Sequence, residues 1–276
     1  MRRFGDTVTS WCDGLPALLA SLAERWRLEL GAPFLVGNSS TAFRCVRADG
    51  IPAVLKLRPD LPVVPEQVAT LELFGPSGRV PAVLNADLGA GAVLLERVEP
   101  GTQVRDLPEL PSATQWAGLM RDLHAAAVPP DYPRDLRAKC DGFFDRIGRR
   151  DPVSLADLER GAARCRALLA TEPARVLLHG DLHLANVLDG GASRGLMAID
   201  PRACVGDPCF DAVAYLLNGA GRDGIETRCA ALAAASGLDE SRLLEWCRAI
   251  APVEAIIYLS RPGTQRAVTE MLELAR

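Results

Sequence analysis

The chain has 276 residues, of which 49% are hydrophobic and 24% charged, so it can bury a full core and general disorder is excluded. Its 31 Lys and Arg are outnumbered by 35 Asp and Glu, and this acidic balance argues against nucleic acid as a partner, because nucleic-acid-binding proteins concentrate positive charge. The balance is compatible with a cationic small molecule. The 8 cysteines include no Cys-x-x-Cys pair, and no apolar run reaches the ~18 residues of a membrane span. We therefore expect a soluble, cytoplasmic, monomeric protein that does not bind membranes.

The first third of the chain predicts a small sheet with one inserted helix. Apolar residues from Leu15 to Leu30 fall on one stripe, which predicts an amphipathic helix over residues 15 to about 30, with Pro16 in its first turn. The Asp49-Gly50 pair between two apolar runs predicts a β-hairpin. Further expected elements are a helix at 65–74 and strands at 79–84 and 92–98.

From Ser112 onward the pattern is mainly helical. Ser112 and Gln115 have the spacing of a capping box, and Pro129-Pro130 is expected to end the helix that they begin. Asp207-Pro208 has the form of an N-cap followed by proline in the first turn. The other expected elements are a helix at 155–169, strands at 175–179 and 195–199, and helices to the end of the chain. We place the boundary at a Pro-Gly pair, which gives an N-lobe at 1–98 and a C-lobe at 99–276.

The most informative segment is His179-Gly180-Asp181-Leu182-His183-Leu184-Ala185-Asn186, followed by Asp200 at the end of the next predicted strand. In kinase catalytic loops, an Asp accepts the proton of the substrate hydroxyl, while an Asn five residues later and an Asp on a following strand hold magnesium. Carboxylate and amide oxygens are the ligands that Mg²⁺ prefers. The spacing therefore predicts Asp181 as the base, with Asn186 and Asp200 as the metal ligands.

Two other interpretations of this segment remain open. His179, Asp181 and His183 alternate, so on a strand they would share a face and could chelate zinc. His124 is the one further histidine, and we interpret it as a packing residue. Alternatively, the segment is a polar turn with buried histidines. In the kinase interpretation, we expect His179 to support the loop.

Lys56 lies in the apolar run from Ile51 to Leu57. Strand alternation places Val54 and Lys56 on one face, which suits an adenine contact beside a phosphate contact. A lysine of this kind is also common on the solvated edge of a sheet. Glu66 or Glu72, on the following helix, is the expected partner that orients the lysine.

Two glycine-containing segments were considered as phosphate loops. Gly89-Ala90-Gly91 lacks a third glycine and a following helix, so it predicts a hairpin turn. Gly37-Asn38-Ser39-Ser40-Thr41 lies between two strands, and its small residues would let backbone N–H groups approach an anion. We expect Ser39 and Ser40 to form this phosphate flap.

Asp211 falls in the first turn of the helix that Asp207-Pro208 opens. An acid at this position complements the helix dipole. It can also act as a buried acceptor that braces the backbone of the catalytic loop, and this is the interpretation that we favour.

The motifs cover nearly the whole chain in a specific order. They are the catalytic loop with Ile199-Asp200-Pro201, and also Gly14-Leu15-Pro16-Ala17-Leu18, Arg25-Trp26, Arg47-Ala48-Asp49-Gly50, Leu55-Lys56-Leu57, Leu94-Leu95-Glu96-Arg97 and Val205-Gly206-Asp207-Pro208. The chain resembles the aminoglycoside phosphotransferase family, and within it the streptomycin 6-kinase branch of aminoglycoside and hydroxyurea resistance kinases.

The resemblance implies an α+β, protein-kinase-like fold with two lobes: a small antiparallel-sheet N-lobe with one helix, and a larger, mainly helical C-lobe. It implies ATP and Mg²⁺ as cofactors, with Lys56 on the α- and β-phosphates and the backbone of Glu96, Arg97 and Val98 at the adenine. Gly180 replaces the arginine of protein kinases, and Asp200-Pro201 replaces Asp-Phe-Gly. We therefore expect neither a phosphorylation-gated activation loop nor a flip of that segment.

The implied acceptor is a streptomycin-like antibiotic, whose guanidinium groups require carboxylates. We expect Asp207, Glu254 and Tyr258 on the substrate side, since Glu254 and Tyr258 are one helical turn apart. The alternatives are a kinase for another hydroxylated amine, a peptide antibiotic or a metabolite, and a pseudokinase that binds ATP without turnover.

Overall fold

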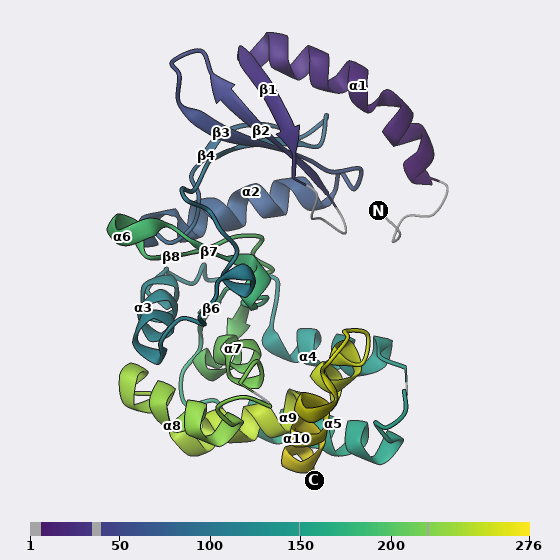
Figure 1. Cartoon of the computed structure of the whole chain (residues 1–276), viewed down its shortest axis with the longest axis vertical. Helices are drawn as coiled ribbons and strands as arrows, with labels where there is room; N and C mark the ends of the chain where they lie inside the picture. The colour runs from purple at the N-terminus through teal and green to yellow at the C-terminus, as the bar shows by residue number, and fades with distance from the viewer. Residues whose placement is uncertain (1–6, 35–39, 149, 220) are drawn as a thin grey trace. The chain divides into compact units, whose positions relative to one another are not determined.

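The computed structural model describes residues 7–34, 40–148, 150–219 and 221–276. The chain divides into two compact units at the Gly101–Thr102 junction. The first unit contains an antiparallel sheet and the second is mainly helical, which confirms the predicted α+β class (Figure 1). No helix in the described part of the chain is both long enough and apolar enough to cross a membrane.

The first unit is built on a five-stranded sheet in the order β1-β2-β3-β5-β4. Each pair of neighbouring strands is antiparallel, and the strands are β1 (Leu28–Pro33), β2 (Thr41–Arg47), β3 (Pro52–Leu57), β4 (Val83–Asp87) and β5 (Ala92–Glu96). The predicted hairpin at Asp49-Gly50 is confirmed: it joins β2 to β3, and Gly50 adopts a φ of +79°. The turn at Gly89–Gly91 likewise joins β4 to β5.

One face of this sheet packs against α1 (Thr7–Trp26) (Figure 1). Leu22 of the helix and Ala53, Leu55 and Leu57 of β3 belong to the same buried cluster. Because side chains alternate along a strand, Lys56 is on the opposite face, as predicted. The remaining helices of this unit are α2 (Val63–Phe74) and the short η1 (Gly75–Ser77).

Two predicted elements of the first unit are displaced. The first helix starts before Leu15 and ends at Trp26, because Arg27 adopts a left-handed φ of 52° and the chain then enters β1. Leu30 is therefore a strand residue that pairs with Cys45, and Pro16 lies inside the helix rather than in its first turn. The strand expected at 79–84 begins only at Val83, since Pro81 has no N–H for the sheet ladder.

The second unit contains long helices and two small two-stranded sheets. Its helices are η2 (Val104–Asp106), α3 (Ala113–His124), α4 (Leu136–Arg146), α5 (Leu155–Leu169), η3 (Leu184–Asn186), α6 (Gly191–Arg194), η4 (Pro208–Ala212), α7 (Val213–Leu217), α8 (Ile225–Ser236), α9 (Glu240–Tyr258) and α10 (Gln265–Ala275). Strand β6 (Val176–Leu178) pairs with β9 (Cys204–Gly206), and β7 (Val187–Asp189) pairs with β8 (Leu196–Ala198). The sequence pattern missed α4, β7 and β9.

Local capping signals in this unit are confirmed. Gln115 N donates to Ser112 Oγ at 3.2 Å, and Ser112 N donates to Gln115 Oε1 at 2.9 Å, which completes the capping box of α3. This helix ends at His124, before the prolines that were expected to end it. Asp207 is the N-cap of η4, as predicted.

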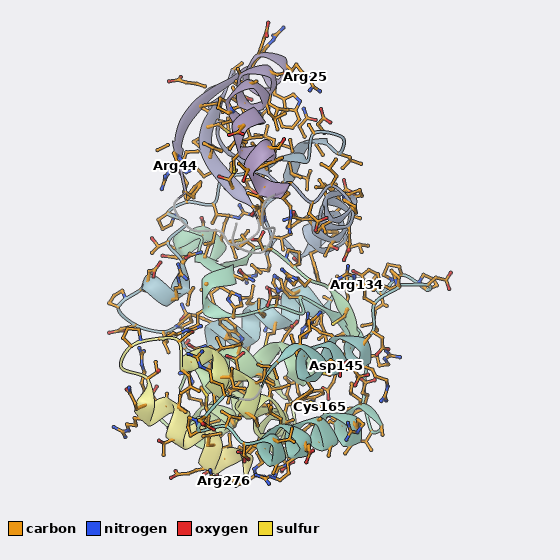
Figure 2. All side chains as sticks on the ribbon, turned by 90° about the vertical axis from the view of Figure 1, so that its right-hand side faces the viewer. Arg25, Arg44, Arg134, Asp145, Cys165 and Arg276 are labelled. Carbon is orange, nitrogen blue, oxygen red and sulfur yellow. The ribbon has the colours of Figure 1, made fainter. Side chains whose placement is uncertain are left out.

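The core of the second unit forms around α9, which packs against α5, α8 and α10 (Figure 1). Trp246 of α9 is fully buried. All eight cysteines are free and seven of them are buried, among them Cys165 on α5 (Figure 2).

Candidate active site

The loop after β6 is held by one buried carboxylate. Asp211 Oδ2 accepts a hydrogen bond from His179 N at 2.7 Å, and Asp211 Oδ1 accepts one from Gly180 N at 2.8 Å. Burial alone would raise the pKa of Asp211, but the hydrogen bond from His124 and these backbone donors hold it below its ordinary value. The geometry is that of a brace on the loop backbone.

His124 was interpreted as a packing residue, and that interpretation is wrong. Its Nε2 atom lies 3.0 Å from Asp211 Oδ2, so the ring is a third partner of the buried acid. The two residues are far apart in sequence and come together only because α3 packs near η4. A lone histidine at the end of an apolar helix gave no signal of this contact.

His179 and Gly180 attach the loop to the segment that carries Asp200. His179 is fully buried, its Nε2 atom contacts Ile199 O at 3.1 Å, and its carbonyl accepts from Arg202 N at 2.9 Å. Gly180 has a φ of +76°, and a Cβ atom there would lie 2.3 Å from Arg202 O. Only glycine fits this backbone position, which explains why the arginine of protein kinases is absent here.

The same contacts contradict the zinc alternative. Both ring nitrogens of His179 have partners within the chain, Nε2 with Ile199 O and Nδ1 with Asp181 N at 3.3 Å. No group of three or more His, Cys, Asp or Glu among the described residues is arranged to hold a metal ion. Burial lowers the pKa of His179, which keeps the ring neutral and suits it to this supporting role.

Asp181 and Asn186 are joined directly. Asn186 Nδ2 donates to Asp181 O at 2.9 Å and approaches Asp181 Oδ2 at 3.3 Å. The β7–β8 hairpin then brings the second acid close, because Ile199 N donates to Asn186 O at 2.8 Å and Asp200 follows immediately. The hairpin thus places the backbone position of Asp200 next to the loop that carries Asp181 and Asn186.

This donor set fits Mg²⁺. The Nδ2 group of Asn186 is turned to Asp181, so its Oδ1 oxygen is the atom that can face a cation. Asp200 adds a carboxylate from the neighbouring position. Magnesium is commonly bound by one or two protein groups, with water and substrate phosphates completing its coordination. The assignment of these two ligands stays a prediction.

Arg202 is a further member of the cluster that the sequence analysis missed. Its Nε atom lies 3.3 Å from Asp181 Oδ2, and half of its side chain is exposed. Its position two residues after Asp200 is the one signal that the sequence offered. The contact places a positive charge directly beside the predicted proton acceptor.

Glu254 and Tyr258 lie one turn apart on α9. Burial raises the pKa of Glu254 to about 7, the charge of Arg261 opposes this shift, and the charge of Asp181 adds to it. Tyr258 donates its hydroxyl to Asn218 Oδ1 at 2.6 Å, and the Arg261 guanidinium lies 4.5 Å from the ring centroid. The structure thus brings Glu254 into the electrostatic field of the predicted base.

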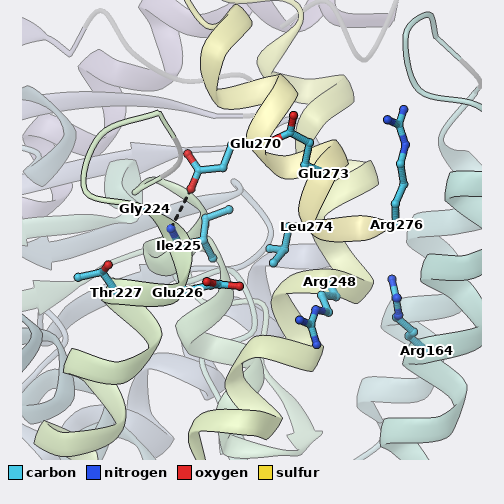
Figure 3. A pocket seen from close by; sticks show the side chains of 10 residues that line it. All are labelled: Arg164, Gly224, Ile225, Glu226, Thr227, Arg248, Glu270, Glu273, Leu274 and Arg276. Atoms are coloured by element: carbon cyan, nitrogen blue, oxygen red, sulfur yellow. Dashed lines mark hydrogen bonds between the residues drawn. The ribbon is translucent and has the colours of Figure 1, made fainter.

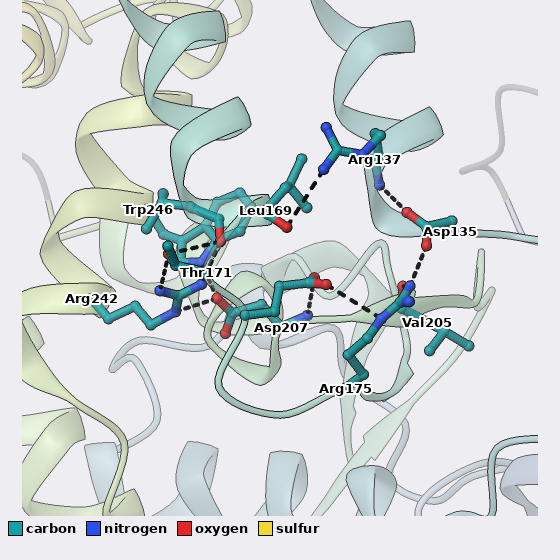
Figure 4. Close-up of polar contacts among 11 residues, drawn as sticks. Asp135, Arg137, Leu169, Thr171, Arg175, Val205, Asp207, Arg242 and Trp246 are labelled. Atoms are coloured by element: carbon teal, nitrogen blue, oxygen red, sulfur yellow. Dashed lines mark hydrogen bonds and ion pairs between the residues drawn. The ribbon is translucent and has the colours of Figure 1, made fainter.

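Asp207 does not belong to the substrate side. It is fully buried, and its Oδ2 atom accepts from Arg242 Nε at 2.5 Å and from Trp246 Nε1 at 2.6 Å (Figure 4). Its Oδ1 atom accepts from Cys209 N at 2.9 Å as the cap of η4. Both oxygens are therefore occupied by the fold, and the prediction that Asp207 contacts the acceptor is wrong.

In the first unit, Lys56 is buried with 6% exposure on β3. Glu66 is partly buried and Glu72 is exposed, which favours Glu66 as the lysine's partner, although the pairing stays a prediction. Ser40 is partly buried and Thr41 begins β2, whereas the first three residues of the expected flap, Gly37, Asn38 and Ser39, lie outside the described residues.

The expected adenine-contacting segment follows β5. Glu96 Oε2 accepts from Ala82 N at 3.1 Å, Arg97 forms an ion pair with Glu99 at 3.6 Å, and Val98 is buried. The side chains of Glu96 and Arg97 thus have structural partners, and the backbone contact to adenine stays a prediction.

A separate pocket lies between α5, α9, α10 and the start of α8 (Figure 3). Glu270 Oε1 accepts a hydrogen bond at 2.9 Å from Ile225 N, at the first residue of α8. None of the residues predicted for catalysis, metal or substrate lines this pocket. Its charged walls are formed by Arg164, Arg248, Arg276, Glu226, Glu270 and Glu273.

The family model for aminoglycoside/hydroxyurea antibiotic resistance kinases matches residues 25–261. The chain belongs to this family. It is 34% identical to a hydroxyurea phosphotransferase of Kitasatospora aureofaciens over 89% of this chain and 74% of that protein. It is 33% identical to a streptomycin 6-kinase of Streptomyces griseus over 76% of this chain and 69% of that protein.

Solved structures agree on the fold of this resistance kinase. Aminoglycoside phosphotransferase APH(4)-Ia, in a ternary complex with ADP and hygromycin B, matches with a TM-score of 0.64 at 18% identity, over 93% of this chain and 96% of that chain. The protein-kinase-like fold is therefore confirmed. The family match confirms that the protein is an enzyme, a kinase of small molecules.

Proposed function

We propose that this kinase transfers the γ-phosphoryl group of ATP to a hydroxyl of streptomycin and thereby inactivates the antibiotic. The observation that carries the proposal is the cluster around Asp181, in which Asn186 fixes the predicted base and Glu254 lies within the field of its charge. A base beside a partly buried acid is suited to a hydroxylated acceptor that carries positive charge. The streptomycin 6-kinase relative supports this choice of acceptor.

In the proposed reaction, the acceptor oxygen forms a bond to the γ-phosphorus as the bond to the β,γ-bridging oxygen breaks. Asp181 accepts the hydroxyl proton, and ADP leaves. Asn186 keeps the Asp181 carboxylate oriented, while Asp211 and His179 keep the loop backbone in place. The enzyme's contribution is mainly positioning and charge stabilisation, as expected for phosphoryl transfer.

Mg²⁺ would be held by Asn186 and Asp200, and it would neutralise charge on the phosphates when bound. In this proposal the unit before Gly101 binds the nucleotide. Lys56, oriented by Glu66, contacts the α- and β-phosphates, Ser39 and Ser40 cover the phosphates, and the backbone of residues 96–98 contacts the adenine.

Hydroxyurea is the second candidate acceptor, because the hydroxyurea phosphotransferase relative is 34% identical. The oxygen of its N–OH group would be phosphorylated, and it would take the place of the streptomycin hydroxyl at Asp181. Hydroxyurea is neutral whereas streptomycin is cationic, so only streptomycin would form an ionic contact with Glu254.

The test is ATP-dependent mass gain of one phosphate, measured for streptomycin, hydroxyurea, a second aminoglycoside and choline. Asp181→Asn and Asp189→Asn serve as a matched pair, since Asp189 on β7 lies close in sequence but is not predicted to act on the acceptor. We expect wild type and Asp189→Asn to phosphorylate streptomycin and Asp181→Asn to be strongly impaired. Phosphorylation of hydroxyurea but not of streptomycin would show that hydroxyurea is the acceptor. ATP binding without phosphate transfer to any of the four compounds would contradict the proposal.

A further inference from the structure

The end of α9 carries an internal cation–π contact. The Arg261 guanidinium carbon lies 4.5 Å from the centroid of the Tyr258 ring. The ring itself is well fixed: its hydroxyl donates to Asn218 Oδ1 at 2.6 Å, and the Tyr258 carbonyl accepts from Arg261 N at 2.9 Å and Thr264 Oγ1 at 2.7 Å. A rigid aromatic face is thus presented to a guanidinium group.

The acid proposed to bind the acceptor lies on the same helix. Glu254 precedes Tyr258 by one helical turn, so the two side chains are neighbours on the helix surface. A carboxylate beside an aromatic face is an arrangement that binds guanidinium groups, since the ring attracts the flat cation and the carboxylate accepts its N–H groups. Here the chain's own Arg261 supplies the cation at the ring, and its charge also acts to lower the pKa of Glu254.

Arg261 is able to leave this position. Tyr258 is 7% exposed, but Arg261 is an exposed residue of the turn between α9 and α10. An exposed arginine on a turn can move to solvent without disturbing the core, so another guanidinium group can take its place on the ring.

We propose that Arg261 occupies the acceptor's guanidinium subsite in the unliganded enzyme and is displaced from the Tyr258 ring when the acceptor binds. This inference rests on the proposed function and adds to it a specific subsite and an internal competitor. The subsite favours flat guanidinium groups over ammonium groups, because only a flat cation can stack on the ring while it donates to Glu254.

The direct test uses methylguanidinium as a probe and does not depend on the acceptor's identity. The chain has 3 tyrosines, so ¹³C labelling of tyrosine rings gives few signals, and Tyr258→Leu assigns the relevant one. Titration of wild type, Arg261→Ala and Arg266→Ala gives an affinity at the Tyr258 ring for each. Arg266 is an exposed arginine at the start of α10 and controls for loss of one positive charge.

We expect methylguanidinium to bind Arg261→Ala roughly 2- to 5-fold more tightly than wild type, which is the scale of an exposed cation–π contact. Arg266→Ala should match wild type, and methylammonium should shift the Tyr258 signal of Arg261→Ala less than methylguanidinium does. Equal affinities in all three proteins, or weaker binding to Arg261→Ala, would overturn the inference. Thermal melting of each variant ensures that folded proteins are compared.

Steady-state kinetics separate this inference from the proposed function. If streptomycin is the acceptor, Arg261→Ala should lower its KM by a similar factor and leave the KM for ATP unchanged. If wild type does not phosphorylate streptomycin while methylguanidinium still binds as described, the proposed acceptor fails and the subsite stands. If streptomycin is phosphorylated but its KM rises in Arg261→Ala, Arg261 is itself an acceptor ligand and the inference fails.

Discussion

Asn186 donates its side-chain amide to the carbonyl oxygen of Asp181 at 2.9 Å and approaches a carboxylate oxygen of the same residue at 3.3 Å. This contact gives one amide two tasks. Its nitrogen fixes the predicted proton acceptor, and its oxygen is left for the predicted metal ion. A change at Asn186 is therefore expected to disturb both the proton acceptor and the metal site. A change at Asp181 should affect the proton acceptor, and a change at Asp200 should affect the metal site.

Asp181→Asn should retain ATP binding and lower kcat by roughly 10²-fold or more, the usual scale for a positioned proton acceptor. The amide has nearly the same shape but a far weaker basicity than the carboxylate. Nucleotide affinity by calorimetry and phosphate transfer by mass spectrometry measure the two effects. Near-normal turnover would remove Asp181 from the mechanism.

Asp200→Ala should abolish activity, because it removes the carboxylate predicted to hold Mg²⁺. Excess magnesium should restore little, since the lost ligand also positions the ion. Asp189→Ala is the control, because Asp189 lies on the same hairpin and accepts a hydrogen bond only from Gly191 N among its described contacts. Comparable losses in both variants would indicate damage to the hairpin rather than to a metal site.

Asp211→Ala should lower the free energy of unfolding by about 1–3 kcal/mol, because it leaves two buried backbone donors without their acceptor. The pKa of Asp211 is lowered in the folded protein, so its charge stabilises the fold at neutral pH. That contribution is lost as pH falls below the ordinary carboxyl range, toward the lowered pKa. Urea titrations at pH 7 should show the loss, and a midpoint equal to that of wild type would contradict the bracing role.

Glu254 should make binding of a guanidinium acceptor depend on pH. Its pKa of about 7 means that the carboxyl is largely neutral at pH 6 and largely charged at pH 8. A cationic acceptor binds the charged carboxylate better than the neutral acid, so kcat/KM for streptomycin should rise from pH 6 to pH 8. Glu254→Gln should flatten this rise, increase the KM for streptomycin and leave the KM for ATP unchanged. An unaltered profile in Glu254→Gln would exclude Glu254 as the titrating group.

Gly180→Ala should destabilise the loop, because a Cβ atom would lie 2.3 Å from Arg202 O on a backbone with φ of +76°. Strain of this kind costs about 1–3 kcal/mol, and movement of Asp181 should reduce kcat as well. Gly14→Ala is the matched control, since its Cβ would meet no atom within 4 Å and it lies in α1, where alanine is favoured. Melting curves that rank the two variants in the opposite order would refute this account.

Local signals in the sequence were enough to determine several parts of this protein. The Asp49-Gly50 turn, the Ser112–Gln115 capping box and the Asp207 N-cap depend on residues a few positions apart, and the structure has all three. The order of the catalytic-loop residues likewise identified the family, because phosphoryl transfer requires an acid and an amide at a fixed spacing.

Contacts between distant residues were decided only by the tertiary structure. Helical periodicity continued past Trp26, but pairing with β2 makes Leu30 part of a strand. Asp207 and Glu254 looked equivalent as acids of the later helices. The fold surrounds Asp207 with Arg242 and Trp246, while it places Glu254 near Asp181. Whether a carboxylate is a structural anchor or a free binding group depends on which donors the packing of remote helices brings to it, and no local pattern in the sequence carries that information.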